Sequence, residues 1–482
     1  MNNKVEQAPL YEKLINISSH SPISFHVPGH KNGKIFPKLG NEKFKQLLSI
    51  DLTELTGLDD LHAPSQVIKE AQDLAANWFQ SKKTYFLVGG STVGNLAMIL
   101  ATCSVGDKVI VQRNCHKSIL NGLELSGAHP IFMAPVYDER VKRYTTPTYK
   151  YIKKAIEDNP KAKAIVLTYP DYFGRTFNLK EVVEFAHSYG IPVLVDEAHG
   201  VHFSLGNFFP ETALESGADV VVQSAHKMAP AMTMASFLHV NSSYVAPDRI
   251  EHFLQMLQSS SPSYPLLASL DLSRLYLQSI TKEELEKIQT SVGCLRDKLS
   301  ESQFWSVLQL VEGEDDPLKI TIQISDFNAR EVATLFEKEN IYPELTTHNQ
   351  ILFIHGLSPF TEWERLDTSL KKINGQLKSK SKRAKIDEKE LYFSSMIQSL
   401  TYSYGKMNKM ETIFLPWEQI DGHIAAEAII PYPPGIPIIA KGENITNKHK
   451  EVIKYLVEQG TTFQNLSIKK GLKVFLNRFK GE

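Results

Sequence analysis

The sequence predicts an α/β protein whose mostly parallel sheet is flanked by helices, followed by a smaller α/β domain and a C-terminal domain. From about residue 84, short β-branched runs alternate with amphipathic segments, which is the rhythm of βαβ units. The runs are apolar along most of their length, which is typical of strands buried on both faces. The predicted strands span residues 85–88, 109–112, 130–133, 164–169, 192–196, 219–223 and 236–240.

Helices are expected between and around these strands. Apolar positions recur at helical spacing over 69–79, 149–158 and 179–189, and residues from about 265 to 300 are expected to form one long helix. Two strand runs around a helix at 329–340 predict the smaller α/β domain. We therefore expect an N-terminal arm (1–50), a large domain (51–275), a small domain (276–385) and a C-terminal domain (386–482).

Composition excludes several classes of protein. The 482 residues are 42% hydrophobic and 22% charged, as in ordinary globular proteins, and the net charge of −1 offers no overall field for nucleic acid or membranes. No run of 18 apolar residues occurs, and the first residues lack the apolar core of a signal peptide. Three widely spaced cysteines are typical of a reducing compartment. We expect a cytoplasmic protein that binds neither nucleic acid nor membranes.

Three polar or irregular stretches are not expected to bind ligands. His26 and His30 have the spacing of a helical metal site, but the Pro-Gly pair between them predicts a loop, so no metal is expected. The basic stretch Lys371–Lys385 lacks interleaved aromatic residues and is expected to be a linker or a helix end. The prolines of Pro431–Thr446 exclude a helix there.

A lysine follows one of the buried strands. Val220–Val222 is β-branched, and Ser224, His226 and Lys227 come directly after it. Ligands of open α/β sheets bind at the carboxyl ends of strands. Burial there disfavours the ammonium form of a lysine and frees its amine for Schiff-base chemistry, whereas an isolated lysine after a strand is usually a surface residue.

Three other strand ends carry polar residues. After the first strand, FLVGGSTVGN gives a glycine turn with Ser91 and Thr92 before a helix that is expected to begin near Asn95, a pattern that suits a phosphate. Asp196 ends a buried strand, where a carboxylate needs a cation, a good donor or a helix to cap. His116 follows another strand, where a lone histidine is more often structural.

The conjunction of these residues predicts a cofactor. Pyridoxal phosphate needs four groups from a protein: an anion site, a ring-stacking histidine, a counter-ion for its ring nitrogen and an amine for its aldehyde. They occur at the ends of successive buried strands, so the sequence predicts that they share one site.

Several motifs resemble the fold-type I ornithine/lysine/arginine decarboxylases, in particular the short form that has no N-terminal flavodoxin-like domain. The similarity covers most of the chain. The motifs that carry it are FHVPGHKNG (25–33), DLTELTGLDDLHAP (51–64), GGSTVGN (89–95), RNCHKS (113–118), VDEAHG (195–200), QSAHKMAPAMT (223–233), SSPSYPLLASLD (260–271) and PYPPGIP (431–437).

The resemblance implies a role for each candidate. Lys227 forms the Schiff base with pyridoxal phosphate, His116 stacks on its ring and Asp196 pairs with its nitrogen; these three are the expected catalytic residues. In relatives a hydroxyl of the SSPSY segment reaches the phosphate of the neighbouring subunit, which implies Ser260 and a homodimer with shared active sites. The expected cofactor-binding residues are Ser91, Thr92, His116, Asp196, His199, Ser224, His226, Lys227 and Ser260.

The chain departs from the family pattern at a few positions. Gly89 stands where Asn is usual, and His423 where Arg or Lys is common. After the lysine, Met228, Met234 and Ala235 replace Thr, Gln and Gly. The change at 234 bears on substrate placement and turnover.

The resemblance implies decarboxylation of arginine, lysine or ornithine to the corresponding amine. The distal cation of such a substrate needs an acidic partner, and Glu427 in the C-terminal domain is the candidate. Two alternatives stay open. The same cofactor chemistry serves an aminotransferase or a β-eliminase, and a homologue that binds the cofactor without turnover would fit the changes at 234 and 235.

Overall fold

A computed structural model describes residues 7–206, 208–379, 395–431, 435–458 and 460–479. An eight-stranded sheet forms its centre, with strand order β1-β9-β8-β7-β6-β2-β3-β14. Its strands are β1 (Lys83–Leu87), β2 (Lys108–Gln112), β3 (His129–Met133), β6 (Ala164–Thr168), β7 (Val193–Asp196), β8 (Val220–Gln223), β9 (Ser236–Val240) and β14 (Ile397–Ser399). We call it the large sheet.

The large sheet is mostly parallel, as predicted. β3, β2, β6, β7 and β8 pair in parallel, whereas β9 runs antiparallel to β8 and β1, and β14 runs antiparallel to β3. All seven predicted strands are present, with ends that differ by at most two residues. The eighth strand comes from the chain beyond residue 394, so this segment completes the large sheet.

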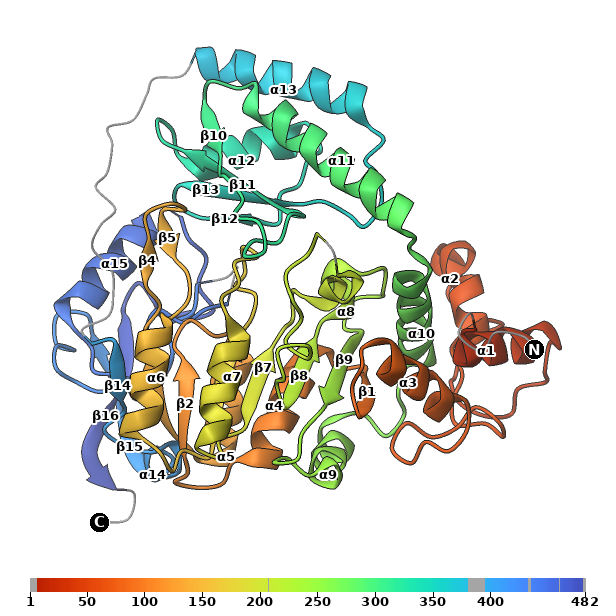
Figure 1. Ribbon diagram of the computed structural model, residues 1–482, viewed down its shortest axis with the longest axis horizontal. Coiled ribbons are helices and arrows are strands. Elements are labelled where there is room, and N and C mark those ends of the chain that lie inside the picture. Colours follow the sequence, from red (N-terminus) through yellow and green to blue (C-terminus); the bar gives the residue numbers. More distant parts are fainter. Residues whose placement is uncertain (1–6, 207, 380–394, 432–434, 459, 480–482) are drawn as a thin grey trace.

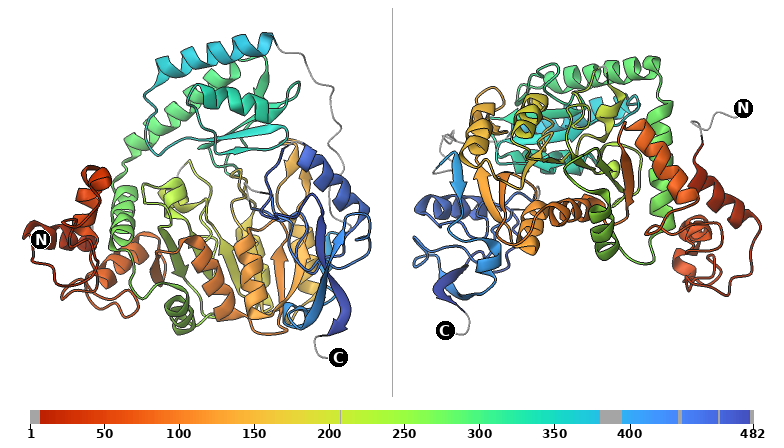
Figure 2. Two further views of the ribbon diagram at one scale, coloured as in Figure 1. Left: turned by 180° about the vertical axis from the view of Figure 1, so that it is seen from behind. Right: turned by 60° about the horizontal axis from the view of Figure 1, so that its bottom comes forward.

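Helices cover both faces of the large sheet (Figures 1 and 2). One face carries α4 (Gly90–Thr102), α5 (Lys117–Ser126) and α9 (Pro247–Leu257), and the other carries α6 (Tyr149–Asp158) and α7 (Leu179–Ser188). Successive strand residues point to opposite faces. Val221 therefore packs in the core with α6 and α7, while Val220 and Val222 pack in the core with α4 and α5.

The N-terminal segment lies beside β1 (Figure 1). It contains α1 (Pro9–Ser19), α2 (Lys38–Ile50) and α3 (Val67–Trp78). The loop predicted around His26 and His30 is present between α1 and α2, and His30 Nε2 lies 3.1 Å from the Asp51 carboxylate.

The prediction of a single long helix over about 265–300 is wrong. The chain forms α10 (Tyr264–Ser279) and α11 (Lys282–Ser300), with a break at Ile280 and Thr281. Thr281 accepts a hydrogen bond from the Glu284 backbone, and the Glu284 carboxylate accepts one from the Thr281 backbone. This capping box starts a new helix, so the T-K-E-E sequence was the signal that periodicity alone missed.

A smaller four-stranded sheet, which we call the small sheet, lies above the large one in Figure 1. Its strands, in the order β10-β11-β13-β12, are all antiparallel. The two predicted strand runs are β11 and β13, and the predicted helix is α12, which ends two residues early. The elements are β10 (Trp305–Val307), β11 (Lys319–Ile324), α12 (Ala329–Lys338), β12 (Leu345–Thr346), β13 (Gln350–Ile354) and α13 (Trp363–Lys378).

The basic stretch and the proline segment are described in part. Residues 371–378 form the end of α13, and residues 380–394 and 432–434 lie outside the described residues. The described remainder of 431–446 contains no helix. No described helix is both long enough and apolar enough to cross a membrane. The remaining elements are β4 (Tyr137–Asp138), β5 (Arg143–Tyr144), η2 (Val201–Leu205), α8 (Ala225–Met228), α14 (Tyr404–Met407), β15 (Met410–Pro416), α15 (Asn447–Glu458) and β16 (Gly471–Phe479).

Candidate active site

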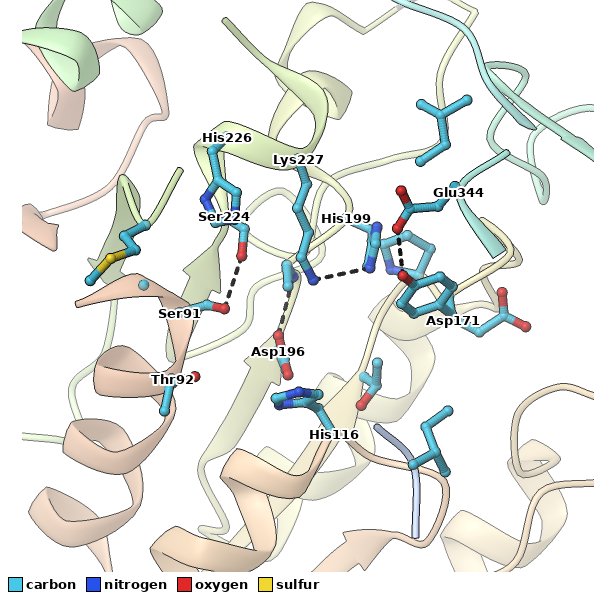
Figure 3. A pocket seen from close by; sticks show the side chains of 18 of the residues that line it. Ser91, Thr92, His116, Asp171, Asp196, His199, Ser224, His226, Lys227 and Glu344 are labelled. Carbon is cyan, nitrogen blue, oxygen red and sulfur yellow. Dashed lines mark hydrogen bonds between the residues drawn. The ribbon is translucent and has the colours of Figure 1, made fainter. Parts of the chain in front are cut away.

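A cavity of about 540 Å³ opens where the loops after β6, β7 and β8 meet the small sheet (Figure 3). Its floor is formed by the strand ends of the large sheet; Ile354 at the end of β13 and Glu344, in the loop just before β12, line it from the small-sheet side. Eight of the predicted site residues line this cavity: Ser91, Thr92, His116, Asp196, His199, Ser224, His226 and Lys227. Residues separated by more than a hundred positions in the chain thus meet because their strands are neighbours.

The predicted anion site lies at the start of α4. The helix begins at Gly90 rather than near Asn95, so Ser91 and Thr92 belong to its first turn, where backbone N–H groups have no partner within the helix. Gly90 adopts φ +75°, which favours glycine, and its N–H donates to the Met234 carbonyl at 2.9 Å. Ser224, directly after β8, donates to the Ser91 hydroxyl at 2.8 Å.

Asp196 ends β7 and is only 3% exposed. Its carboxylate accepts hydrogen bonds from the Asn95 side-chain amide at 2.9 Å and from the Ala198 backbone at 3.2 Å. Both donors are neutral, and no described lysine or arginine forms an ion pair with it. A buried carboxylate in this state fits a cationic group of a ligand.

His116 caps the N-terminus of α5. Its Nδ1 lies 2.8 Å from the Ser118 hydroxyl, which in turn accepts from the Asn95 amide at 2.9 Å. Burial lowers the pKa of His116, and the nearby Asp196 carboxylate opposes that shift. The imidazole is therefore favoured in its neutral form, as stacking on a cationic ring requires.

Lys227 projects from α8 into the cavity (Figure 3). Burial lowers the pKa of Lys227, with the Asp196 and Glu344 carboxylates acting in the opposite direction. Its Nζ lies 3.1 Å from His199 Nε2. His226, the preceding residue, engages the Ala235 carbonyl with Nδ1 at 3.0 Å, and burial lowers the pKa of His226.

The structure does not bring Ser260 or Glu427 into this cavity. Ser260 is exposed in the segment before α10, away from the cavity lining of its own chain. Glu427 accepts from the Lys473 backbone at 2.9 Å and from the Asn465 amide at 3.5 Å. An acidic side chain that does line the cavity is Glu344, in the loop just before β12, whose carboxylate accepts from the Tyr172 hydroxyl at 2.5 Å.

Sequence reasoning missed several polar residues in and around this cavity, among them Tyr172, Asn95, Lys319 and Glu344. Tyr172 follows β6 in the run YPDYFG, and a strand-end signal could have found it. Asn95 lies one helical turn beyond the phosphate loop, on the side that faces β7. Lys319 begins a strand, and Glu344 lies in a loop, so neither has a local pattern that points to a ligand.

The residues present fit pyridoxal phosphate. Asp196 is a buried carboxylate that forms no ion pair with a lysine or arginine among the described residues, as a protonated pyridine nitrogen requires. The hydroxyls of Ser91 and Ser224 meet at a helix N-terminus, which suits a phosphate. Lys227 supplies a largely desolvated amine in the same cavity. A mostly parallel sheet that carries this set at its strand ends defines the class of fold-type I pyridoxal phosphate enzymes.

Comparisons with known proteins identify the family. The model of the Orn/Lys/Arg decarboxylase major domain matches residues 8–314, and that of the Orn/Lys/Arg decarboxylase C-terminal domain matches residues 387–466. The chain therefore belongs to the Orn/Lys/Arg decarboxylase family, as the motifs indicated.

Relatives resemble the chain over nearly its full length. Uncharacterized protein YaaO of Bacillus subtilis is 42% identical, over 98% of this chain and 99% of that protein. An arginine decarboxylase of the same organism is 36% identical over 95% of each. Among solved structures, the lysine decarboxylase LdcF of Francisella novicida superimposes with a TM-score of 0.79 at 19% identity, over 97% of this chain and 81% of that one. This last likeness confirms the predicted fold class.

Proposed function

We propose that this protein is a pyridoxal-phosphate-dependent decarboxylase that converts a basic amino acid to the corresponding amine. One observation carries the proposal: the largely desolvated amine of Lys227 shares a cavity with the buried carboxylate of Asp196, and the acidic Glu344 lines the same cavity. Membership of the Orn/Lys/Arg decarboxylase family supports the reaction and the substrate class.

The cofactor's ring, when bound, accepts the electron pair that remains when carbon dioxide leaves the substrate. Lys227 holds the cofactor through its amine, and Asp196 keeps a proton on the ring nitrogen. His116 would pack against the ring and orient the substrate carboxylate. The first turn of α4, with Ser91, Thr92, Ser224 and His226, binds the phosphate. These roles are supported by the position of each side chain in one cavity.

The substrate's distal cation is recognised by Glu344. A carboxylate that already accepts from the Tyr172 hydroxyl at 2.5 Å keeps a fixed orientation and can still accept from an amine or a guanidinium. Arginine is the first substrate to test, because relatives at 34–36% identity are named arginine decarboxylases. Lysine and ornithine carry the same distal charge at a different distance from the α-carbon.

The active form is a homodimer in which Ser260 of each subunit reaches the partner's phosphate site. Ser260 is exposed in its own chain, and the N-terminal arm exposes large apolar side chains, with Ile23 at 81%, Phe25 at 94% and Leu39 at 100%. Burial of such residues against a second subunit would stabilise the pair. Light scattering of the purified protein measures the mass, and a monomer at working concentration would contradict this part of the proposal.

The experiment that tests the function loads the protein with pyridoxal phosphate and offers arginine, lysine and ornithine separately. Mass spectrometry then follows agmatine, cadaverine and putrescine. One amine formed well above the others supports the proposal and identifies the substrate. A keto acid would favour an aminotransferase or a β-eliminase. Normal cofactor binding with no product would favour a homologue without turnover.

A further inference from the structure

The His199 imidazole lies between two lysine amines. Its Nε2 is 3.1 Å from Lys227 Nζ, and its Nδ1 is 2.9 Å from Lys319 Nζ. Lys227 follows β8 of the large sheet, whereas Lys319 begins β11 of the small sheet, so the imidazole connects the two sheets across the cavity. Figure 3 shows Lys227 and His199 pointing toward one another.

All three groups are largely removed from water. His199 is 5% exposed and Lys319 is 3% exposed. Lys319 also donates to the Tyr172 carbonyl at 3.2 Å, which fixes its position. Burial and the two neighbouring lysines keep the pKa of His199 well below its ordinary value, so the ring is neutral.

A neutral imidazole has one N–H donor and one lone pair. If both ring nitrogens are hydrogen-bonded to lysine amines, one amine donates to the lone pair and the other accepts from the N–H. An ammonium group has no lone pair to accept with, so the accepting lysine is neutral. The hydrogen bonds of His199 therefore allow only one of the two amines, Lys227 or Lys319, to be protonated at a time.

We propose that Lys319 is the proton reserve of Lys227, which it keeps neutral and resupplies through the His199 ring. A proton leaves the Lys319 ammonium for His199 Nδ1, and the proton on Nε2 passes to the Lys227 amine. The imidazole is neutral before and after and has only changed tautomer. Lys319 is then a neutral amine, which regains its proton from solvent water.

This inference rests on the proposed function for its purpose. Loss of carbon dioxide from an amino acid, followed by formation of an amine, consumes one proton at the α-carbon. A neutral Lys227 is needed to bind a carbonyl group, and a protonated one is needed to deliver that proton. Lys319 supplies both states without a second charge in the cavity, and it is a positioning residue because it acts through His199.

The surroundings of Lys319 suit a group that exchanges its proton. Burial lowers the pKa of Lys319 to about 8, which the nearby carboxylates oppose. The charged groups that face it come from its own loop and from three other segments: Asp171, Lys227, Asp316 and Glu344.

The first test measures the protonation of Lys227 directly in the full-length protein without added cofactor. Acetic anhydride acylates only neutral amines, so mass spectrometry of the Lys227 peptide over a range of pH gives its titration midpoint. Lys319→Met removes the charge at similar length and is expected to raise that midpoint by about one pH unit, because a like charge nearby disfavours the ammonium. An unchanged midpoint overturns the proposal.

The second test uses Lys319→Arg, which keeps the charge but cannot release a proton. The Lys227 midpoint is expected to stay near that of the parent. The kcat is expected to fall about 100-fold or more with little change in KM, because general acid–base proton transfer contributes about 10²–10⁴-fold. Parent-like kcat in the arginine variant overturns the relay. Lys319→Gln provides a second neutral variant if the methionine variant fails to fold.

The two proposals fail separately. Labelling of Lys227 needs neither cofactor nor substrate, so absence of amine product from the parent contradicts the proposed function alone. Amine production by the parent together with an unshifted Lys227 midpoint in the neutral variant Lys319→Met contradicts the relay alone.

Discussion

The Asn95 side-chain amide on α4 donates a 2.9 Å hydrogen bond to the Asp196 carboxylate at the end of β7. The same amide lies 2.9 Å from the Ser118 hydroxyl, which contacts His116. One buried amide therefore helps to orient both side chains that are expected to hold the cofactor ring.

Replacement of Asn95 by Ala is expected to weaken pyridoxal phosphate binding about 10–100-fold. The change leaves a buried carboxylate without its side-chain donor, and a hydrogen bond to a charged group contributes about 1.5–3 kcal/mol. Titration followed by absorbance gives the Kd. Ser118→Ala is the matched control, since it spares the bond to Asp196 and should have a smaller effect. Equal affinity in Asn95→Ala and the parent would contradict the assignment.

Glu344→Gln is expected to raise KM for the preferred basic amino acid about 10–100-fold, because it removes the charge that pairs with the distal cation. Steady-state kinetics measures the change, and kcat should change less. Glu427→Gln is the matched control and should behave like the parent, since Glu427 lies outside the cavity. The reverse pattern would restore Glu427 as the substrate residue.

Glu443→Gln is expected to destabilise the protein by about 3–5 kcal/mol. The Glu443 carboxylate receives two hydrogen bonds of 2.6 Å from the Arg113 guanidinium, and both side chains are nearly buried. The substitution leaves the arginine charge buried with a weaker partner. Denaturant unfolding measures the loss, provided that the transition is two-state. Glu251→Gln breaks the exposed pair with Lys83 and should cost less than about 1 kcal/mol.

His239 is expected to make the fold sensitive to acid. It is fully buried between Thr84 and Gln223, and burial lowers the pKa of His239 to about 3. The histidine of the unfolded chain binds a proton near pH 6.5, whereas that of the folded chain does not. The contribution of His239 to the free energy of unfolding is therefore complete above pH 6.5 and is lost as pH falls toward 3. The parent should lose about 2 kcal/mol between pH 7 and pH 5 from this group alone.

Substitution of Gln for His239 keeps polar atoms for both partners and removes the titration. The slope of unfolding free energy against pH is expected to decrease by about one proton over that range. Urea unfolding at several pH values measures it. An identical slope in the two proteins would assign the acid sensitivity to other buried histidines.

Met234 adopts φ +80°, a backbone conformation that L-residues rarely occupy, at a position where the family tends to have Gln. Met234→Gly removes this strain, which stabilises the folded state by about 1–2 kcal/mol. The glycine also adds conformational entropy to the unfolded chain, which partly offsets that gain, so the free energy of unfolding should be equal or higher. Met232→Gly, with an ordinary backbone, should instead lose about 0.5–1 kcal/mol. Thermal unfolding compares the two, and a larger loss at 234 would contradict the strain.

Much of the fold could be predicted because strand identity is a local property. Val220–Val222 is apolar and β-branched without interruption, so both of its faces are buried only if the strand lies between two layers of helices. All seven such runs are strands of the large sheet. The break at Thr281 was missed for the opposite reason. It depends on one capping box, which does not disturb the apolar periodicity on either side.

The site shows where local reasoning ends. The sequence alone determined that Ser91, His116, Asp196 and Lys227 lie at strand ends, and parallel strands carry their ends to one edge of a sheet. That edge fixes the cofactor side of the cavity before any coordinates are known.

Only the tertiary structure decided what stands opposite those residues. Glu344 lines the cavity, and Lys319 contacts the cavity residue His199, because the small sheet folds over the large one. The 2.9 Å contact between Lys319 and His199 joins residues 120 positions apart. Glu427, an equally acidic candidate, is turned toward Lys473 and Asn465 instead. Contacts between distant segments form when two hydrophobic faces pack together. This packing produces no regular spacing in the sequence, so the sequence does not indicate which polar side chain will face the ligand.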